Sequence, residues 1–207
     1  MSTLFLRFFD TRCYNISHSS MKIMLKSYAI VIIFIFAVLT AAFTVSLASG
    51  ENLFFLFSPA FNSGARIPHK YANRQIGGEN ISIPLFWKYA PTGTKSFAVS
   101  MIDMSASGFK HWTVIYIPAS VMSIGEGKSG VGMPKGSREL KNDFDSEGYG
   151  GPAPPKNTGV HNYVVTVYAL KRDPLDVPDD ISYGAFTGLI QKFTIAKASI
   201  TGKMEQK

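Results

Sequence analysis

Cysteine is almost absent from this sequence, and the one that occurs, Cys13, lies close to the N-terminus. From residue 14 onward the chain therefore has no thiol. This excludes a disulfide framework, a cysteine nucleophile and a thiolate metal site in that part of the protein. A domain of about 150 residues can bury enough apolar surface to fold without such cross-links.

Charge runs and repeats are missing as well. The 21 basic and 14 acidic residues give a net charge of +7, but the lysines and arginines are scattered and are not interleaved with aromatic residues. This pattern is typical of a solvated surface, so we expect no nucleic-acid partner. The net charge supports only a mild attraction to anionic ligands or head groups. The length fits one domain plus an appendage.

One long apolar run stands out against this ordinary composition. Residues 28–48 contain no charged side chain, Lys22 and Lys26 precede them, and small residues close the run at Ala48. This order of basic, apolar and small residues is typical of a secretory signal peptide. We therefore expect residues 21–48 to be a signal, and the protein to be periplasmic or secreted.

The same run is long enough to span a bilayer, so an uncleaved membrane anchor is the alternative. In that case the domain lies outside the cytoplasm, and the protein meets the membrane through residues 28–48. No cysteine follows the run, which argues against a lipoprotein anchor. Met21 and Met24 are further candidate start sites, and residues 1–20 are then an extension that is not translated.

Beyond residue 48 the pattern changes to short apolar stretches separated by turns. It predicts a mainly β domain of the sandwich type over residues 49–207, with one or two short helices and the apolar N-terminal helix before it. Ser182 is a suitable N-cap for a helix over residues 183–191. Prolines favour extended segments at 58–61, 67–71 and 81–87. Because Pro84 lies inside the last segment, we expect it to be an edge strand or an extended segment. Strands are expected at 96–103, 111–117, 161–170 and 192–200.

Strand alternation brings polar residues to the ends of apolar strands. Asp103 ends the first of these strands, and its face also carries Phe97, Val99 and Met101. His111 begins the next strand, on a face with Thr113, Ile115 and Ile117. If the two strands are antiparallel neighbours, Asp103 and His111 lie at the same end of the sheet.

The Gly/Pro-rich stretch 148–160 leads directly into the strand 161–170. His161 and Tyr163 share a face with Val165 and Val167, so they lie at the mouth of an apolar strand. We expect the loop above them to be rich in backbone N–H groups. Such an arrangement favours a small-molecule or anion site.

Four sequence blocks resemble those of the phosphatidylethanolamine-binding protein family, including its bacterial Raf kinase inhibitor-like branch. The resemblance covers about residues 54–202. The most specific block runs from Gly150-Gly151-Pro152-Ala153-Pro154-Pro155 to Thr158-Gly159-Val160-His161-Asn162-Tyr163. The others lie at 78–87, at 96–103 with 109–112, and at 196–202.

The resemblance implies a β-sandwich with a small anion-binding pocket at one end, which takes phosphate or a phospholipid head group without catalysis. Imidazole and phenol groups can donate to phosphate oxygens, and the acid can orient a histidine or bind the ammonium of ethanolamine. No cofactor and no metal is expected. The implied lining is Asp103, His111, His161 and Tyr163, with Gly151, Pro152 and Pro154 from the loop.

The chain departs from the family pattern after Asp103, where Ser105 replaces a second acid and the usual prolines are missing. We expect a looser loop there. Two alternatives stay open. The protein could be an inhibitor or modulator of an envelope protein partner, or a hydrolase that uses the acid and the two histidines. A metal site on those three residues is a weaker possibility.

Overall fold

The computed structural model describes Ile32, residues 54–172 and residues 176–207. The expectations for residues 1–20 and 21–48, Ile32 excepted, concern residues outside these ranges. Within the described ranges, no helix has both the length and the apolar character needed to cross a membrane.

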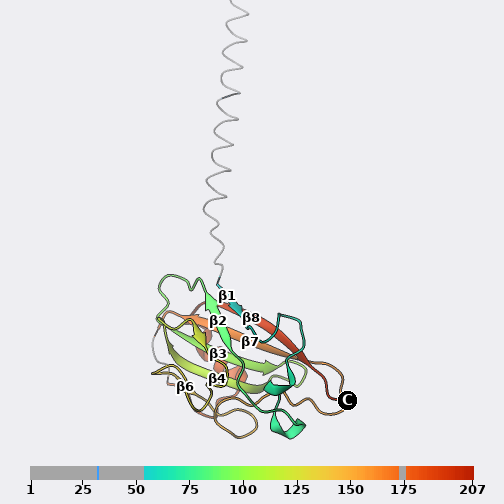
Figure 1. The fold of residues 1–207 in the computed structure, drawn as a ribbon. Helices are drawn as coiled ribbons and strands as arrows, with labels where there is room; N and C mark the ends of the chain where they lie inside the picture. The colour runs from blue at the N-terminus through green and yellow to red at the C-terminus, as the bar shows by residue number, and fades with distance from the viewer. Residues whose placement is uncertain (1–31, 33–53, 173–175) are drawn as a thin grey trace, which may run out of the picture. The chain divides into compact units, whose positions relative to one another are not determined.

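The chain divides into two units, of which the second, Asn52–Lys207, carries the strands. Its larger sheet is antiparallel, with the order β6-β4-β3-β7-β8 (Figure 1). All eight residues of the central strand β3 are buried. The bounds are β3 Ser96–Asp103, β4 Phe109–Pro118, β6 Arg138–Glu139, β7 His161–Leu170 and β8 Thr194–Met204.

A smaller antiparallel sheet, of order β1-β2-β5, packs on the larger one. Its strands are β1 (Phe55–Phe57), β2 (Leu85–Lys88) and β5 (Ser123–Ile124). Because β2 is the middle strand, the expectation of an edge strand at 81–87 is wrong. Pro84 lies just before β2, where its missing N–H removes no ladder hydrogen bond. The core between the sheets includes Trp87 edge-on to Phe97, with ring centroids 5.4 Å apart.

The helix α2 (Tyr183–Gln191) covers the other face of the large sheet. Its buried side chains Phe186 and Ile190 belong to a second apolar cluster with Ala98 and Ile115. The Ser182 side chain caps it as expected, accepting a hydrogen bond from the Ala185 N–H at 3.3 Å. The mainly β class with a short helix is therefore confirmed.

Two segments expected to be extended are not. Ser58 pairs with Phe61 in an isolated bridge that closes a tight turn, because Pro59 is as compatible with a turn as with a strand. Residues 67–71 contain the 3-10 helix η1 (His69–Tyr71), which begins just after Pro68. Proline is well tolerated at the start of a helix. A second 3-10 helix, η2, spans Arg74–Ile76.

The strand β4 contains two bulges that sequence alternation does not reveal. Met101 pairs with Trp112 and Ile102 with Lys110, so His111 is an extra residue. A second register shift lies near Tyr116, whose φ is 59°. The expectation that His111, Thr113, Ile115 and Ile117 share one face is therefore wrong. Ile117 packs between the sheets and Ile115 on the helix side.

Candidate functional site

Four predicted site residues meet at one end of the large sheet. Asp103 ends β3 and pairs with Tyr163 on β7, His161 begins β7, and His111 is the bulged residue of β4. Exposed fractions are small: 3 % for Asp103, 2 % for His111, 6 % for His161 and 0 % for Tyr163. The side chains therefore form a nearly closed cluster.

Asp103 binds both a histidine and its own turn. Its Oδ2 lies 2.6 Å from His161 Nδ1, and its Oδ1 accepts a hydrogen bond from the Ser105 N–H at 2.8 Å. The Ser105 hydroxyl in turn accepts one from the Asn162 N–H at 3.0 Å. Ser105 thus ties the turn to β7 by hydrogen bonds.

Burial favours the neutral form of the His111 imidazole. Its Nδ1 lies 2.7 Å from the Gly150 carbonyl oxygen, which can only accept, so Nδ1 carries the proton. Burial lowers the pKa of His111, and the hydrogen bond to Gly150 offsets this only in part. The other nitrogen, Nε2, is then an acceptor. The ring packs against Phe109, Phe144 and Tyr163, with centroids 5.1–5.4 Å away.

The Tyr163 hydroxyl is buried and finds no hydrogen-bond partner in the described part of the chain. Burial, and then the negative charge of Asp103, raise the pKa of this phenol, whereas the Ala153 N–H lowers it. Asp103 and Ala153 are therefore close enough to act on the hydroxyl without bonding to it in good geometry. A buried donor in this state is a natural contact for a ligand oxygen.

His161 uses both of its nitrogens within the protein. Nδ1 contacts Asp103, and Nε2 lies 2.9 Å from the Thr158 hydroxyl. Thr158 also lies 2.7 Å from the Pro155 carbonyl oxygen. The single hydroxyl proton of Thr158 can be donated either to His161 or to the Pro155 carbonyl oxygen, but not to both. If the Thr158 proton goes to Pro155, the Thr158 oxygen is the acceptor in its contact with His161 Nε2.

The Gly/Pro loop is not rich in available N–H groups, and that expectation is wrong. The Gly150 N–H donates to the His111 carbonyl oxygen at 2.8 Å, and the Gly151 N–H donates to Asn80 Oδ1 at 2.7 Å. Prolines at 152, 154 and 155 have no N–H. Among these loop residues, the N–H that points to the cluster is that of Ala153.

The three predicted loop residues, Gly151, Pro152 and Pro154, belong to the packed part of the loop next to the site. A Cβ on Gly151 would lie 2.2 Å from the Tyr71 carbonyl oxygen, so the close approach to residues 71–73 requires glycine there. The Pro152 carbonyl accepts a hydrogen bond from the Asn73 N–H at 2.9 Å. Pro154 is buried.

Sequence reasoning missed Thr158 and Asn80. Thr158 precedes His161 by three residues in an irregular loop, and no periodic pattern links the two. Asn80 lies in a turn, with φ 57°, and its amide also donates to the Tyr149 carbonyl at 3.1 Å. Asn80 and Thr158 were both inside the family-like blocks, which was the one signal available for either.

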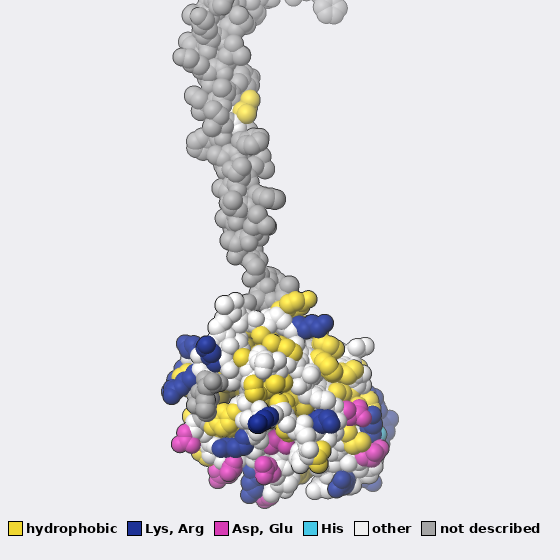
Figure 2. All heavy atoms as spheres, turned by 60° about the vertical axis from the view of Figure 1, so that its left-hand side comes forward, with side chains coloured by type: hydrophobic (Ala, Val, Ile, Leu, Met, Phe, Trp, Pro, Cys, Tyr) yellow, Lys and Arg dark blue, Asp and Glu magenta, His cyan; other side chains and the backbone are white. Residues whose placement is uncertain are grey.

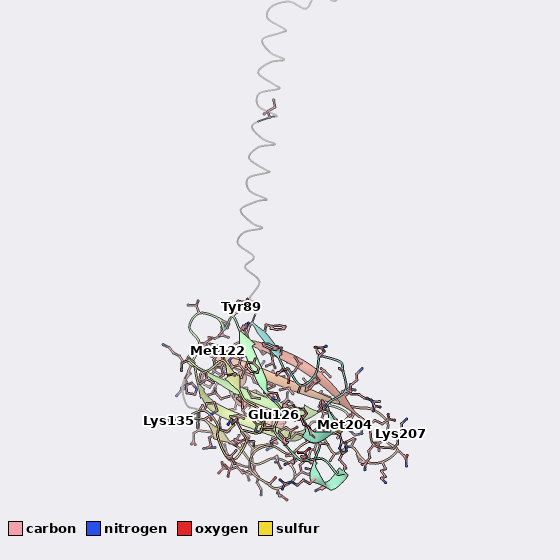
Figure 3. All side chains as sticks on the ribbon, viewed as in Figure 1. Tyr89, Met122, Glu126, Lys135, Met204 and Lys207 are labelled. Atoms are coloured by element: carbon pink, nitrogen blue, oxygen red, sulfur yellow. The ribbon has the colours of Figure 1, made fainter. Side chains whose placement is uncertain are left out.

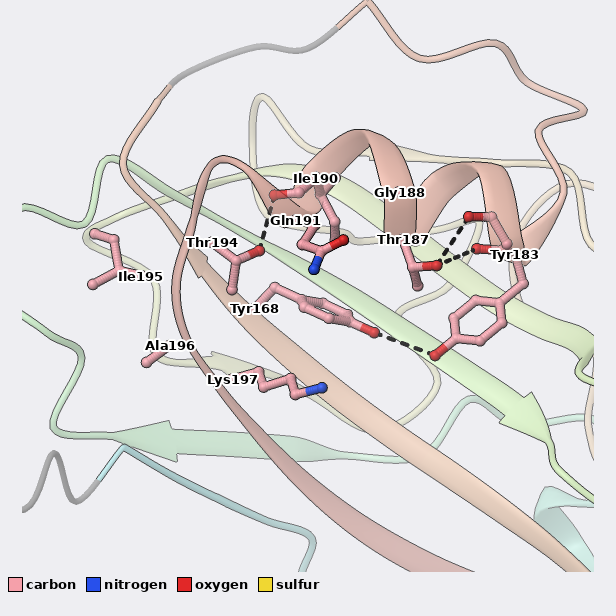
Figure 4. Close-up of a pocket in the computed structure, with 11 residues that line it drawn as sticks. Tyr168, Tyr183, Thr187, Gly188, Ile190, Gln191, Thr194, Ile195, Ala196 and Lys197 are labelled. Carbon is pink, nitrogen blue, oxygen red and sulfur yellow. Dashed lines mark hydrogen bonds between the residues drawn. The ribbon is translucent and has the colours of Figure 1, made fainter.

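A cavity of about 800 Å³ lies elsewhere, between α2 and β8 (Figure 4). Its hydroxyls already have partners: Tyr168 and Tyr183 lie 3.5 Å apart, and Thr194 donates to the Ile190 carbonyl at 3.0 Å. These groups do not call for a ligand. In the ranges that the structure describes, no group of three or more His, Cys, Asp or Glu side chains could hold a metal ion.

Comparisons with known proteins identify the family and agree with the fold. A family model described as phosphatidylethanolamine-binding protein matches residues 57–205. The UPF0098 protein YbhB of Escherichia coli K12 is 40 % identical over 154 residues, which are 70 % of this chain and 96 % of YbhB. The UPF0098 protein YbcL of the same organism is 40 % identical over 146 residues, or 67 % of this chain and 79 % of YbcL.

Solved structures are similar as well. The crystal structure of E. coli YbcL, titled a new member of the mammalian PEBP family, superposes with a TM-score of 0.70 at 34 % identity. The match covers 74 % of this chain and 99 % of YbcL. The crystal structure of CT736 of Chlamydia trachomatis, a candidate homolog of phosphatidylethanolamine-binding protein, superposes with a TM-score of 0.63 at 26 % identity. This match covers 76 % of this chain and 100 % of CT736. This chain thus belongs to the phosphatidylethanolamine-binding protein family, in the bacterial UPF0098 branch with YbhB and YbcL.

Proposed function

We propose that this protein binds a small phosphate-bearing ligand at the Asp103 end of the large sheet and catalyses no reaction on it. The phosphate belongs either to a free phosphate monoester or to a phospholipid head group. The buried, unpartnered hydroxyl of Tyr163 carries this proposal. Leaving such a donor unsatisfied costs about 1–3 kcal/mol, which a ligand oxygen would recover.

The charges around Tyr163 favour a ligand with two polar groups. Burial first, and then the carboxylate of Asp103, raise the pKa of the phenol. The negative charge of Asp103 also repels a bare anion. A ligand with both phosphate and ammonium groups, such as phosphoethanolamine, offsets this repulsion. Its phosphate would accept from Tyr163 and the Ala153 N–H while its ammonium approaches Asp103.

Binding must be coupled to a local movement, because Tyr163 is fully buried and the other three side chains are at most 6 % exposed. Thr158 is exposed and lies on His161. Displacement of the loop around Thr158 would open the cluster and release Nε2 of His161 to the ligand.

Titration calorimetry of the protein tests the proposal. Inorganic phosphate, phosphoethanolamine and a short-chain phosphatidylethanolamine separate the two sources of phosphate. Tyr163→Phe removes one hydroxyl, and we expect it to weaken binding about tenfold or more, the loss of one hydrogen bond to a charged group. Tyr168→Phe is the matched control, because Tyr168 lies on the same strand but packs on the helix side. Its affinity should equal that of the wild type.

Two results would contradict the proposal. One is that none of the three probes releases or absorbs heat with the wild-type protein. The other is that Tyr163→Phe and Tyr168→Phe bind the probe equally well.

A hydrolase is the second candidate, favoured by the chain of contacts from Thr158 through His161 to Asp103. Hydroxyl, imidazole and carboxylate are connected in this order in acyl-transferring enzymes. The competing contact of Thr158 with the Pro155 carbonyl draws the hydroxyl proton away from the imidazole. We therefore expect no turnover of phosphate or carboxylate esters, and turnover that Thr158→Val abolishes would favour the enzyme.

An extracytoplasmic location is part of the proposal. The uncharged run 28–48 supports export. A Mycobacterium tuberculosis relative, 35 % identical over 115 residues, is named as a candidate lipoprotein. This chain has no cysteine after its apolar run, so any anchor here would be the run itself.

A further inference from the structure

The end of the domain opposite the candidate site exposes apolar side chains. Phe55 is 53 % exposed, Tyr89 67 % and Met122 40 %. Phe55 pairs with the exposed Lys88 across β1 and β2, Tyr89 follows Lys88, and the Met122 carbonyl accepts from the Trp87 N–H at 3.0 Å. Figure 3 shows Tyr89 and Met122 at the same end of the domain. We call Phe55, Lys88, Tyr89 and Met122 the N-terminal patch.

The chain enters the domain at this patch. Phe54 precedes Phe55 and stacks on Phe97, near the first residue of β3. Residues 49–53 are all that separate Phe54 from the uncharged run 28–48. Five residues span at most about 18 Å. A bilayer that held the run would therefore lie within that distance of the patch.

We propose that residues 28–48 are retained as a membrane anchor and that the N-terminal patch rests on the surface of the same bilayer. Aromatic rings with a polar tip, such as Tyr89, favour the head-group level of a membrane. Lys88 can reach anionic head groups while its stem lies on apolar surface.

Packing makes the patch a preformed surface. Phe55 stacks on Phe57 and Phe57 on Phe86, with centroid distances of 5.8 and 5.3 Å. Figure 2 shows hydrophobic side chains next to a basic one at the upper end of the domain. A lipid surface accounts for apolar rings beside a cation better than bulk water does, because water leaves the ring area unburied.

The proposal orients the candidate site. Asp103 and Ser96 are the two ends of β3, and eight residues of strand measure about 23 Å. Met204, which pairs with His161, marks the site end in Figure 3. An anchored domain would hold that end away from its own membrane, so the ligand arrives from the aqueous phase. This last step rests on the proposed function, whereas the bilayer contact does not.

Fluorescence quenching by brominated lipid tests the contact. The full chain is reconstituted in vesicles of phosphatidylethanolamine and phosphatidylglycerol with brominated acyl chains. The native Trp87 and Trp112 are fully buried and give a constant background. In Tyr89→Trp, the brominated lipid should quench most of the fluorescence that the new tryptophan adds. Met104→Trp, at an exposed position of the site end, should keep it. Met122→Trp is a second probe of the patch that does not depend on the strained backbone at Tyr89, where φ is 59°.

Two outcomes overturn the proposal. In one, both patch probes are quenched no more than Met104→Trp. In the other, mass spectrometry of the protein from cell membranes and supernatant finds only a chain that begins after residue 48. Loss of ligand binding with intact quenching would count against the proposed function alone.

Discussion

Burial makes His111 resist protonation in the folded protein. Its folded-state pKa lies below the ordinary 6.5 because of burial. An unfolded His111 takes up a proton near pH 6.5 while the folded one resists it, so this residue costs stability as the pH falls below about 6.5. With Nδ1 committed to Gly150, Nε2 can meet a phosphate oxygen only if a proton lies between them.

Ligand binding should therefore take up one proton at alkaline pH, where both His111 and a phosphate monoester have lost theirs. We expect the Kd for phosphoethanolamine to rise about tenfold per pH unit above pH 7.5. His111→Gln should flatten this dependence. His69→Gln is the control, since His69 is exposed and is not one of the four clustered side chains. Calorimetry between pH 6 and 9 would refute the assignment if the wild type and His111→Gln showed the same slope.

At the scale of elements, regular strands could be predicted and irregular ones could not. Residues 96–103 and 161–170 match β3 and β7 because neither strand contains an extra residue. The strand β4 was assigned the wrong face beyond its bulges, because neither His111 nor Tyr116 is a glycine that would mark an irregularity.

The same division holds for the candidate site. The meeting of Asp103, His111 and His161 could be predicted, since Asp103 and His161 lie at strand ends and His111 lies two residues inside β4. The use of the loop N–H groups could not, because it depends on Asn80, which is 71 residues away from Gly151 in the chain. Long-range hydrogen bonds of this kind leave no periodic trace in a sequence.

Two glycines should respond to alanine in opposite ways. Gly188, inside α2, has open space where a Cβ would lie, so Gly188→Ala should stabilise the protein by about 0.5–1 kcal/mol.

Gly151→Ala would force a Cβ against the Tyr71 carbonyl and should destabilise the protein by about 1–3 kcal/mol. Urea unfolding measures both, and a stable Gly151→Ala would show that the loop does not need this close packing.

On the scale of the whole molecule, we propose a function for each end of the domain. The buried cluster of Asp103, His111 and Tyr163 lies at one end of β3, and the N-terminal patch lies at the other. The larger sheet separates them and is covered on one face by the smaller sheet and on the other by α2 (Figure 1). If both proposals hold, substitutions at one end should change ligand binding without changing membrane contact, and the reverse.

A crystal structure of the protein with phosphoethanolamine tests the central claim most directly. The account predicts a phosphate oxygen about 2.5–3.0 Å from the Tyr163 hydroxyl, a normal hydrogen-bond distance, with a second oxygen facing His111 Nε2. Phosphoethanolamine bound in the cavity between α2 and β8, with the Tyr163 hydroxyl still unpartnered, would contradict it.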